Sequence, residues 1–134
     1  MPTEEEWERA ARGQDGREYP WGAGYQTGYA NIDERYSKAG EWSLEQTTAV
    51  GVYLHAASAE GVFDLSGNVW EWCLNKYDQP DQGEADTSGE SRVARGGAWY
   101  DFPDYARGSQ RLRYLPVFRD YLRGFRLVSS APIA

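Results

Sequence analysis

Between Gly16 and Ser58 the chain has no sustained helical or strand periodicity, although this segment carries many large aromatic side chains. They are Tyr19, Trp21, Tyr25, Tyr29, Tyr36 and Trp42. Because rings of this size are unfavourable in water, we expect ordered loops here rather than a flexible linker. The whole chain has 6 Trp, 10 Tyr, 4 Phe and 15 Gly, which favours a core of aromatic rings beneath irregular loops over a helical bundle.

The length of 134 residues predicts a single domain over 1–134 with a substantial core. The sequence has no apolar stretch long enough to span a bilayer, and its acidic beginning lacks the pattern of an export signal. We therefore expect a cytoplasmic protein. One cysteine, Cys73, and one histidine, His55, exclude an internal disulfide, a Cys-based zinc site and a His-rich metal centre.

The first predicted element is a short amphipathic helix after Thr3. Thr3 and Glu6 have the spacing of a capping box, and Gly13 provides a stop signal. The apolar residues of this helix recur on one face: Trp7, Ala10 and Ala11.

Short strands are predicted later in the chain, which makes the expected fold class α+β. Residues 62–65 lead into a turn and a strand within 66–73, because apolar and polar residues alternate there. Alternation resumes over 93–99, with a glycine pair that allows a turn or close packing, and residues 124–128 are predicted to form another short strand. Residues 78–91 are acidic and nearly free of apolar side chains, so we expect an exposed connection.

Charge is divided unevenly along the chain. Residues 1–91 have a formal net charge of −12, whereas residues 92–126 have eight arginines and three aspartates, giving +5. Arginine forms planar, paired bonds to carboxylates and carbonyls, so we interpret most of these residues as structural braces. The alternative, a nucleic-acid-binding stripe, is disfavoured by the overall charge of −7, and we expect neither a nucleic-acid nor a membrane partner.

Five sequence blocks occur in an order that resembles one known family. The blocks are 2–13 (PTEEEWERAARG), 19–22 (YPWG) with 30–31 (AN), 64–72 (DLSGNVWEW), 92–99 (RVARGGAW) and 124–128 (GFRLV). They resemble the formylglycine-generating enzyme, or sulfatase-modifying factor, family. The resemblance implies a loop-rich variant of the C-type lectin fold with short antiparallel strands and few helices. It also implies that only the later part of the family domain is present, without its opening strand and helix.

The resemblance also bears on catalysis. Catalytic members bind copper through two cysteines five residues apart after the glycine pair, because thiolates suit Cu(I). Asp101 and Ala106 stand at those positions, and Ala98 stands where a serine is common. We therefore expect a non-catalytic module that requires no cofactor. Two alternatives remain: an oxidase-type enzyme of the same family, and a recognition or scaffolding domain cut from a larger signalling protein.

Residues 100–122 resemble the diversified segment in variable proteins of diversity-generating retroelements. Mutating adenines in an Asn codon can yield Tyr, Asp, Phe, Leu or Val but not Lys, Glu, Met or Trp, and the segment contains none of those four. We expect a surface for a ligand, most simply a protein, with the oligomeric state left open. The candidate ligand-binding residues are Tyr100, Asp101, Phe102, Asp104, Tyr105, Tyr114, Leu115, Val117, Phe118, Asp120 and Tyr121. The alternative is that the rings fill the core; we expect those flanked by aspartates to be the more exposed.

Family members often hold structural calcium in loops. The resemblance implies a calcium site at Asn68 and Glu71, with Asn31 in a second family-like region, since hard oxygen ligands suit Ca²⁺. The alternative is that Asn68 adopts a turn conformation and Glu71 pairs with an arginine. Both interpretations stay open from the sequence.

Overall fold

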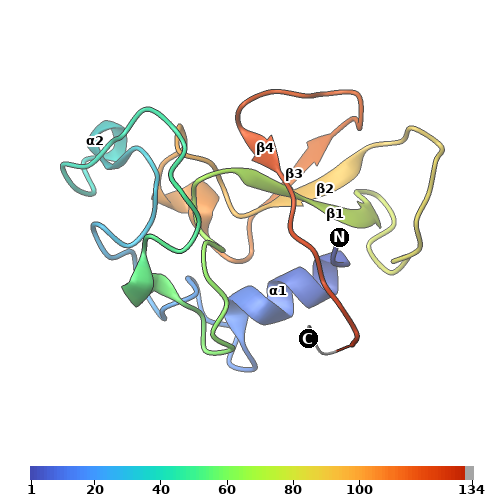
Figure 1. Ribbon diagram of the computed structural model, residues 1–134, viewed down its shortest axis with the longest axis horizontal. Helices are drawn as coiled ribbons and strands as arrows, with labels where there is room; N and C mark the ends of the chain where they lie inside the picture. Colours follow the sequence, from blue (N-terminus) through green and yellow to red (C-terminus); the bar gives the residue numbers. More distant parts are fainter. Residues whose placement is uncertain (132–134) are drawn as a thin grey trace.

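The computed structural model describes residues 1–131, in which one helix packs across a face of a small sheet (Figure 1). In chain order the elements are α1 (Glu4–Arg12), α2 (Glu34–Ser37), the 3-10 helix η1 (Leu54–Ala56), β1 (Trp70–Lys76), β2 (Arg92–Arg95), the 3-10 helix η2 (Pro103–Ala106), β3 (Arg111–Tyr114) and β4 (Arg123–Gly124). This is an α+β fold with long connections. Within residues 1–131, no helix is long and apolar enough to cross a membrane.

The predicted N-terminal helix is confirmed as α1. The Thr3 hydroxyl accepts a bond from the Glu6 amide, and the Glu6 carboxylate accepts one from the Thr3 amide, so both halves of the capping box form. Gly13 ends the helix with φ of 60°. Trp7 and Ala11 are buried, and Ala10 packs at the margin of the same cluster.

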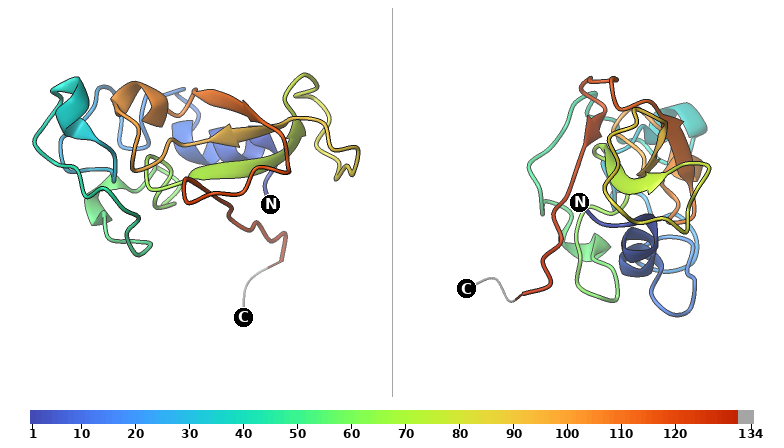
Figure 2. Two further views of the ribbon diagram at one scale, coloured as in Figure 1. Left: turned by 90° about the horizontal axis from the view of Figure 1, so that it is seen from above. Right: turned by 90° about the vertical axis from the view of Figure 1, so that its right-hand side faces the viewer.

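The sheet has the strand order β3-β2-β1-β4. β2 pairs antiparallel with both β1 and β3, whereas β4 pairs parallel with β1. The views in Figure 2 show α1 on one side of this sheet and the chain between β3 and β4 arching above the other side. β3 and the loop from β3 to β4 contain residues 111–122, so this half of the segment 100–122 is attached to the sheet at both ends.

Alternation along β1 and β2 divides the core into two sides. Cys73 and Val93 face α1 and pack with Trp7, whereas Trp70 and Ala94 pack on the opposite side. On that opposite side, the buried cluster is flanked by Tyr105, Leu112, Tyr114 and Leu122. Rings of residues 100–122 therefore contribute partly to the core, as the alternative interpretation of the sequence proposed.

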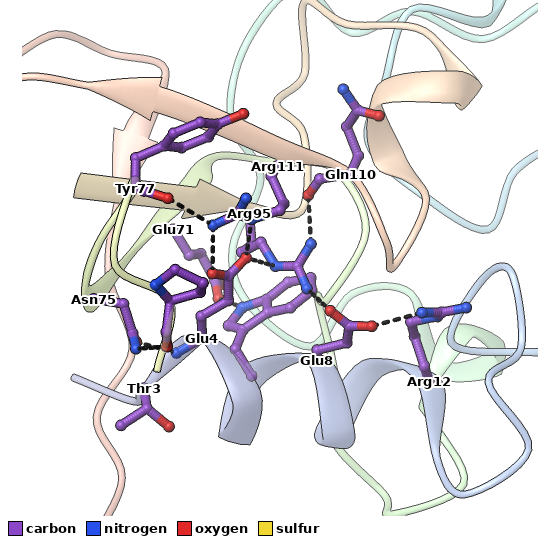
Figure 3. A network of polar contacts seen from close by, with 12 residues as sticks. Thr3, Glu4, Glu8, Arg12, Glu71, Asn75, Tyr77, Arg95, Gln110 and Arg111 are labelled. Carbon is purple, nitrogen blue, oxygen red and sulfur yellow. Dashed lines mark hydrogen bonds and ion pairs between the residues drawn. The ribbon is translucent and has the colours of Figure 1, made fainter. Parts of the chain in front are cut away.

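Ion pairs run through the layer between α1 and the sheet (Figure 3). Arg95 on β2 is fully buried and bonds Glu8, while its Nε lies 3.4 Å from Glu4. Arg111 on β3 donates to both oxygens of Glu4, at 2.5 and 2.9 Å. The Arg95 guanidinium also lies 5.4 Å from the centre of the Trp7 ring. Arginines late in the chain thus fix the first helix to the sheet.

The strand predictions need three corrections. The predicted strand over 93–99 ends at Arg95, because Gly96 and Gly97 adopt φ of 100° and 77° and turn the chain. The predicted strand over 124–128 is wrong beyond Gly124: residues 125–128 form no ladder with the described strands, and Phe125 and Leu127 are exposed. β3 was not predicted, because its arginines interrupt the apolar pattern.

Residues 16–58 form ordered loops with only α2 and η1 as short helices. Tyr19 is buried with Ala30 and Ile32, and Trp21 stacks on Tyr19 at 5.1 Å between ring centres. Two rings of this segment are exposed instead: Tyr36 (78 %) and Trp42 (62 %). The exposed connection predicted over 78–91 is confirmed, apart from the half-buried residues Gly83, Asp86 and Ser91, of which Asp86 bonds Arg92.

Candidate ligand-binding surface

The turn after β2 directs the chain onto the side of the sheet away from α1. A Cβ on Gly97 would lie 3.1 Å from the Ala106 Cα and 3.1 Å from the Tyr105 carbonyl oxygen, so only glycine allows this approach to η2. The amide of Trp99 donates to the Asn68 carbonyl at 3.0 Å. The backbone therefore fixes where residues 99–106 begin.

Asp101 lies at the centre of this region and is half-buried. One carboxylate oxygen, Oδ2, accepts bonds from the Trp70 indole at 2.7 Å and from the Ala98 amide at 2.9 Å. Burial raises the pKa of the Asp101 carboxyl, although these two bonds act to lower it. Asp101 also accepts a backbone bond, since the Asp33 amide donates to its carbonyl at 2.7 Å.

Two groups of aromatic rings flank Asp101. In the first, Trp99 contacts both Tyr100 and Tyr121, with ring centres 5.8 and 5.9 Å apart. In the second, Phe102 lies between Tyr36 and Tyr105, at 5.5 and 4.9 Å. Tyr105 in turn meets the edge of buried Trp70 at 6.4 Å. The second group joins α2 to the segment after β2.

Arginines brace the loops of this surface, as the charge pattern predicted. Arg123 bonds Asp120, and its guanidinium lies 3.5 Å from the centre of the Tyr114 ring. Arg107 bonds Asp104 at 2.9 Å and Glu18 at 3.0 Å. Seven of the eight arginines in residues 92–126 form ion pairs within the described chain: Arg92, Arg95, Arg107, Arg111, Arg113, Arg123 and Arg126.

The candidate ligand-binding residues divide into exposed and half-buried sets. The exposed set, which we call the ligand face, is Tyr100, Asp104, Leu115, Val117, Phe118, Asp120 and Tyr121. The half-buried set is Asp101, Phe102, Tyr105 and Tyr114. Among the rings flanked by aspartates, Tyr100 (68 %) and Tyr121 (72 %) are exposed, but Phe102 and Tyr105 are not. Ligand binding by these residues stays a prediction.

Tyr36 lies at this surface, although the sequence did not assign it there. It is exposed and stacks on Phe102, although it lies 64 residues before Tyr100, the first residue of the segment 100–122. The backbone bond from Asp33, the N-cap of α2, to Asp101 is what brings it there. No local pattern around Tyr36 indicates this pairing.

The residues proposed for calcium are engaged with protein groups. Glu71 accepts bonds from Arg126 on both oxygens, at 2.6 and 2.7 Å, and one from the Trp7 indole at 2.6 Å. Asn68, at φ of 70°, accepts bonds from the Asn31 amide group and the Thr48 backbone amide. Within residues 1–131, no cluster of three or more His, Cys, Asp or Glu side chains is placed to hold a metal. A cation at Glu71 would have to displace a guanidinium.

Asn31 differs from the other two proposed ligands. Its side chain is buried, and its Oδ1 is an acceptor without a hydrogen-bond donor among the described residues. One orphaned amide oxygen does not make a calcium site, which needs several oxygen ligands. The contacts of Asn68 and Glu71 are therefore those of the alternative interpretation, a turn conformation and a pair with Arg126, and calcium binding stays to be tested by titration.

Asp101 and Ala106, which stand where catalytic members have copper-binding cysteines, are also engaged in contacts with the protein itself. The Asp101 carboxylate accepts hydrogen bonds from the Trp70 indole and the Ala98 amide. Ala106 is fully buried in the cluster with Tyr19 and Ile32. The single cysteine, Cys73, lies on β1 facing α1, and burial raises its pKa to about 12. Its thiol is a core group rather than an exposed thiolate.

This arrangement, a curled mixed sheet of short strands beneath long braced loops, defines a fold of the formylglycine-generating-enzyme type. Residues 1–131 match the family described as the sulfatase-modifying factor enzyme 1-like domain, and the chain belongs to this family. The resemblance drawn from the five sequence blocks is thereby confirmed.

Particular relatives include both inactive and catalytic proteins. The chain is 34% identical over 139 residues to the inactive C-alpha-formylglycine-generating enzyme 2 of Bos taurus, covering 98% of this chain and 44% of that protein. It is 33% identical over 145 residues to the hercynine oxygenase of Mycobacterium tuberculosis, covering 95% and 31%. Among solved structures, Treponema denticola variable protein 1 matches with a TM-score of 0.70 and 30% identity, covering 93% and 45%. The chain spans less than half the length of each of these relatives.

Proposed function

We propose that this chain is a non-catalytic binding module that presents the ligand face to a protein partner. The observation that carries the proposal is the exposure of large apolar side chains on braced loops: Tyr100 (68 %), Val117 (76 %) and Tyr121 (72 %). Tyrosine offers a large contact area at a small entropic cost, and the arginine braces limit the ordering needed on binding. The similarity to a variable protein supports this role.

Two observations support the absence of catalysis. The positions where catalytic members carry copper-binding cysteines hold Asp101 and Ala106, and the remaining thiol is buried with a raised pKa. The similarity to an inactive formylglycine-generating enzyme agrees with this proposal, whereas the similarity to hercynine oxygenase keeps the enzyme alternative open to test. Copper titration combined with a sulfatase-peptide oxidation assay tests it; turnover would overturn the proposal.

The binding role is tested by selecting peptides from a displayed library against the whole chain. We expect the selected peptides to lose binding when Tyr100→Ala and Tyr121→Ala are combined. The matched control combines Val50→Ala with Leu54→Ala, two exposed apolar side chains outside residues 100–122. Peptides that bind both double variants equally well would contradict the ligand face.

A further inference from the structure

We infer that Asp101 is an anchor for a basic side chain, lysine or arginine, on the protein that the ligand face binds. This inference rests on the proposed function and adds the chemistry of the partner. The two carboxylate oxygens of Asp101 differ in their hydrogen bonds. Both donors, the Trp70 indole and the Ala98 amide, reach the same oxygen, Oδ2.

The other oxygen, Oδ1, accepts no hydrogen bond from residues 1–131 and is absent from the set of fully buried unpartnered atoms, so it reaches the surface. Asp101 also has no ion-pair partner within the described chain. Arg123 attracts it only at longer range, because that guanidinium bonds Asp120 and stacks on Tyr114. Asp101 is therefore a half-buried carboxylate with one free acceptor and no neutralising cation.

Such a carboxylate has already lost part of its hydration in the free protein. An arriving cation therefore gains a charge-assisted bond, while part of the desolvation cost of the aspartate is already met in the free protein. The other acids of the ligand face are not equivalent, since Asp104 bonds Arg107 and Asp120 bonds Arg123. This contrast singles out Asp101.

The flanking rings favour an organic cation. Tyr100 and Phe102 adjoin Asp101 in the chain, and each belongs to a packed aromatic group, with Trp99 and Tyr121 on one side and Tyr36 on the other. Aromatic faces attract ammonium and guanidinium groups. A metal ion would need further oxygen ligands, and residues 1–131 contain no group of three or more His, Cys, Asp or Glu side chains placed to hold one. A phosphate group would be repelled.

Arg119, between β3 and β4, is exposed and forms no ion pair with a carboxylate among residues 1–131. Arg119 would repel a basic partner group, whereas Asp101 would attract it. The exposed apolar side chains Leu115, Val117 and Phe118 are available for the apolar part of the same partner.

The test uses the whole chain and two small probes followed by ¹H–¹⁵N NMR: N-acetyl-lysine methylamide and its uncharged analogue N-acetyl-norleucine methylamide. The reporter is the Trp70 indole N–H, which bonds Asp101 directly. We expect a saturable shift of this resonance with the lysine probe and not with the norleucine probe. Asp101→Asn, whose amide oxygen can keep both bonds at Oδ2, should weaken lysine binding about tenfold or more.

The control is Asp78→Asn, which removes an exposed aspartate outside residues 100–122 that already pairs with Arg113 and should leave lysine binding unchanged. Equal lysine affinity in the Asp101→Asn variant, an equal response to norleucine, or no response to lysine would each overturn the inference. A calcium titration that shifts the same resonance would favour a metal instead and overturn it too. Peptide selection tests the ligand face separately, so the face can be upheld while the cation anchor fails.

Discussion

Asp101 has two effects on folding that act in opposite directions. Its Oδ2 satisfies the indole of Trp70, which is buried, but its charge is partly desolvated and its pKa is raised by burial. A carboxyl whose folded-state pKa is raised holds its proton more tightly in the folded than in the unfolded state. The ionised carboxyl therefore lowers the free energy of unfolding at neutral pH. This cost is relieved as the pH falls through the folded-state pKa and the carboxyl takes up a proton.

Asp101→Asn should accordingly raise the melting temperature at pH 7, with the gain shrinking as the pH falls through the folded pKa of Asp101. Asp101→Ala, by contrast, leaves the Trp70 and Ala98 donors unpaired and should cost about 2–3 kcal/mol. Thermal unfolding of the three proteins across pH checks both. An Asn variant less stable than wild type at pH 7 would show that the charge itself is stabilising.

The bonding of Glu71 leads to a prediction about calcium. Because Arg126 and Trp7 occupy its carboxylate, we expect the melting temperature to be unchanged by a chelator or by added calcium. Magnesium is the matched control ion. A rise in melting temperature specific to calcium would instead support a loop site that includes the unpartnered Asn31 oxygen.

At the scale of elements, the turn after β2 depends on the glycine at position 97. Gly97 and Gly89 have nearly the same φ, 77° and 78°, but a Cβ on Gly89 would meet nothing within 4 Å. Gly89→Ala should therefore cost only the left-handed conformation, about 1 kcal/mol. Gly97→Ala adds a clash with the backbone of η2 and should cost about 3 kcal/mol or more. Chemical denaturation measures both, and equal costs would contradict the packing argument.

The elements that the sequence predicts well are those whose signals are local. Thr3, Glu6 and Gly13 specify both ends of α1 within eleven residues, and the structure agrees. β3 and β4 exist because they pair with strands far away in the chain, so apolar alternation does not mark them. The same limit applies to the site: the exposure of Tyr100 follows from its neighbours, whereas the stacking of Tyr36 on Phe102 depends on a backbone bond between distant loops.

For the whole molecule, the uneven charge along the sequence becomes a set of long-range ion pairs. Glu4 and Glu8 near the N-terminus meet Arg95 and Arg111 from the arginine-rich segment. Arg95→Met should cost about 3 kcal/mol, because Glu8 and the Gln110 carbonyl lose a buried donor. The control Arg113→Met removes the exposed pair with Asp78, which lies in the connection between β1 and β2, and should cost about 0–1 kcal/mol. An equal loss in the free energy of unfolding of the two variants would contradict the argument that burial makes the Arg95 ion pairs the more important ones.

The same ion pairs should control unfolding in acid. Burial alone would raise the pKa of Glu8, but the bonds from Arg12 and Arg95 outweigh burial and lower it. A lowered folded-state pKa means that the stabilisation is present above the ordinary value of 4.5 and is lost as pH falls from there through the folded pKa. Arg95→Met removes part of that lowering, so its free energy of unfolding should fall less steeply below pH 4.5 than that of wild type. Urea titrations at a series of pH values measure the two slopes, and parallel curves would mean that Arg95 stabilises the molecule by packing against Trp7 rather than by its charge.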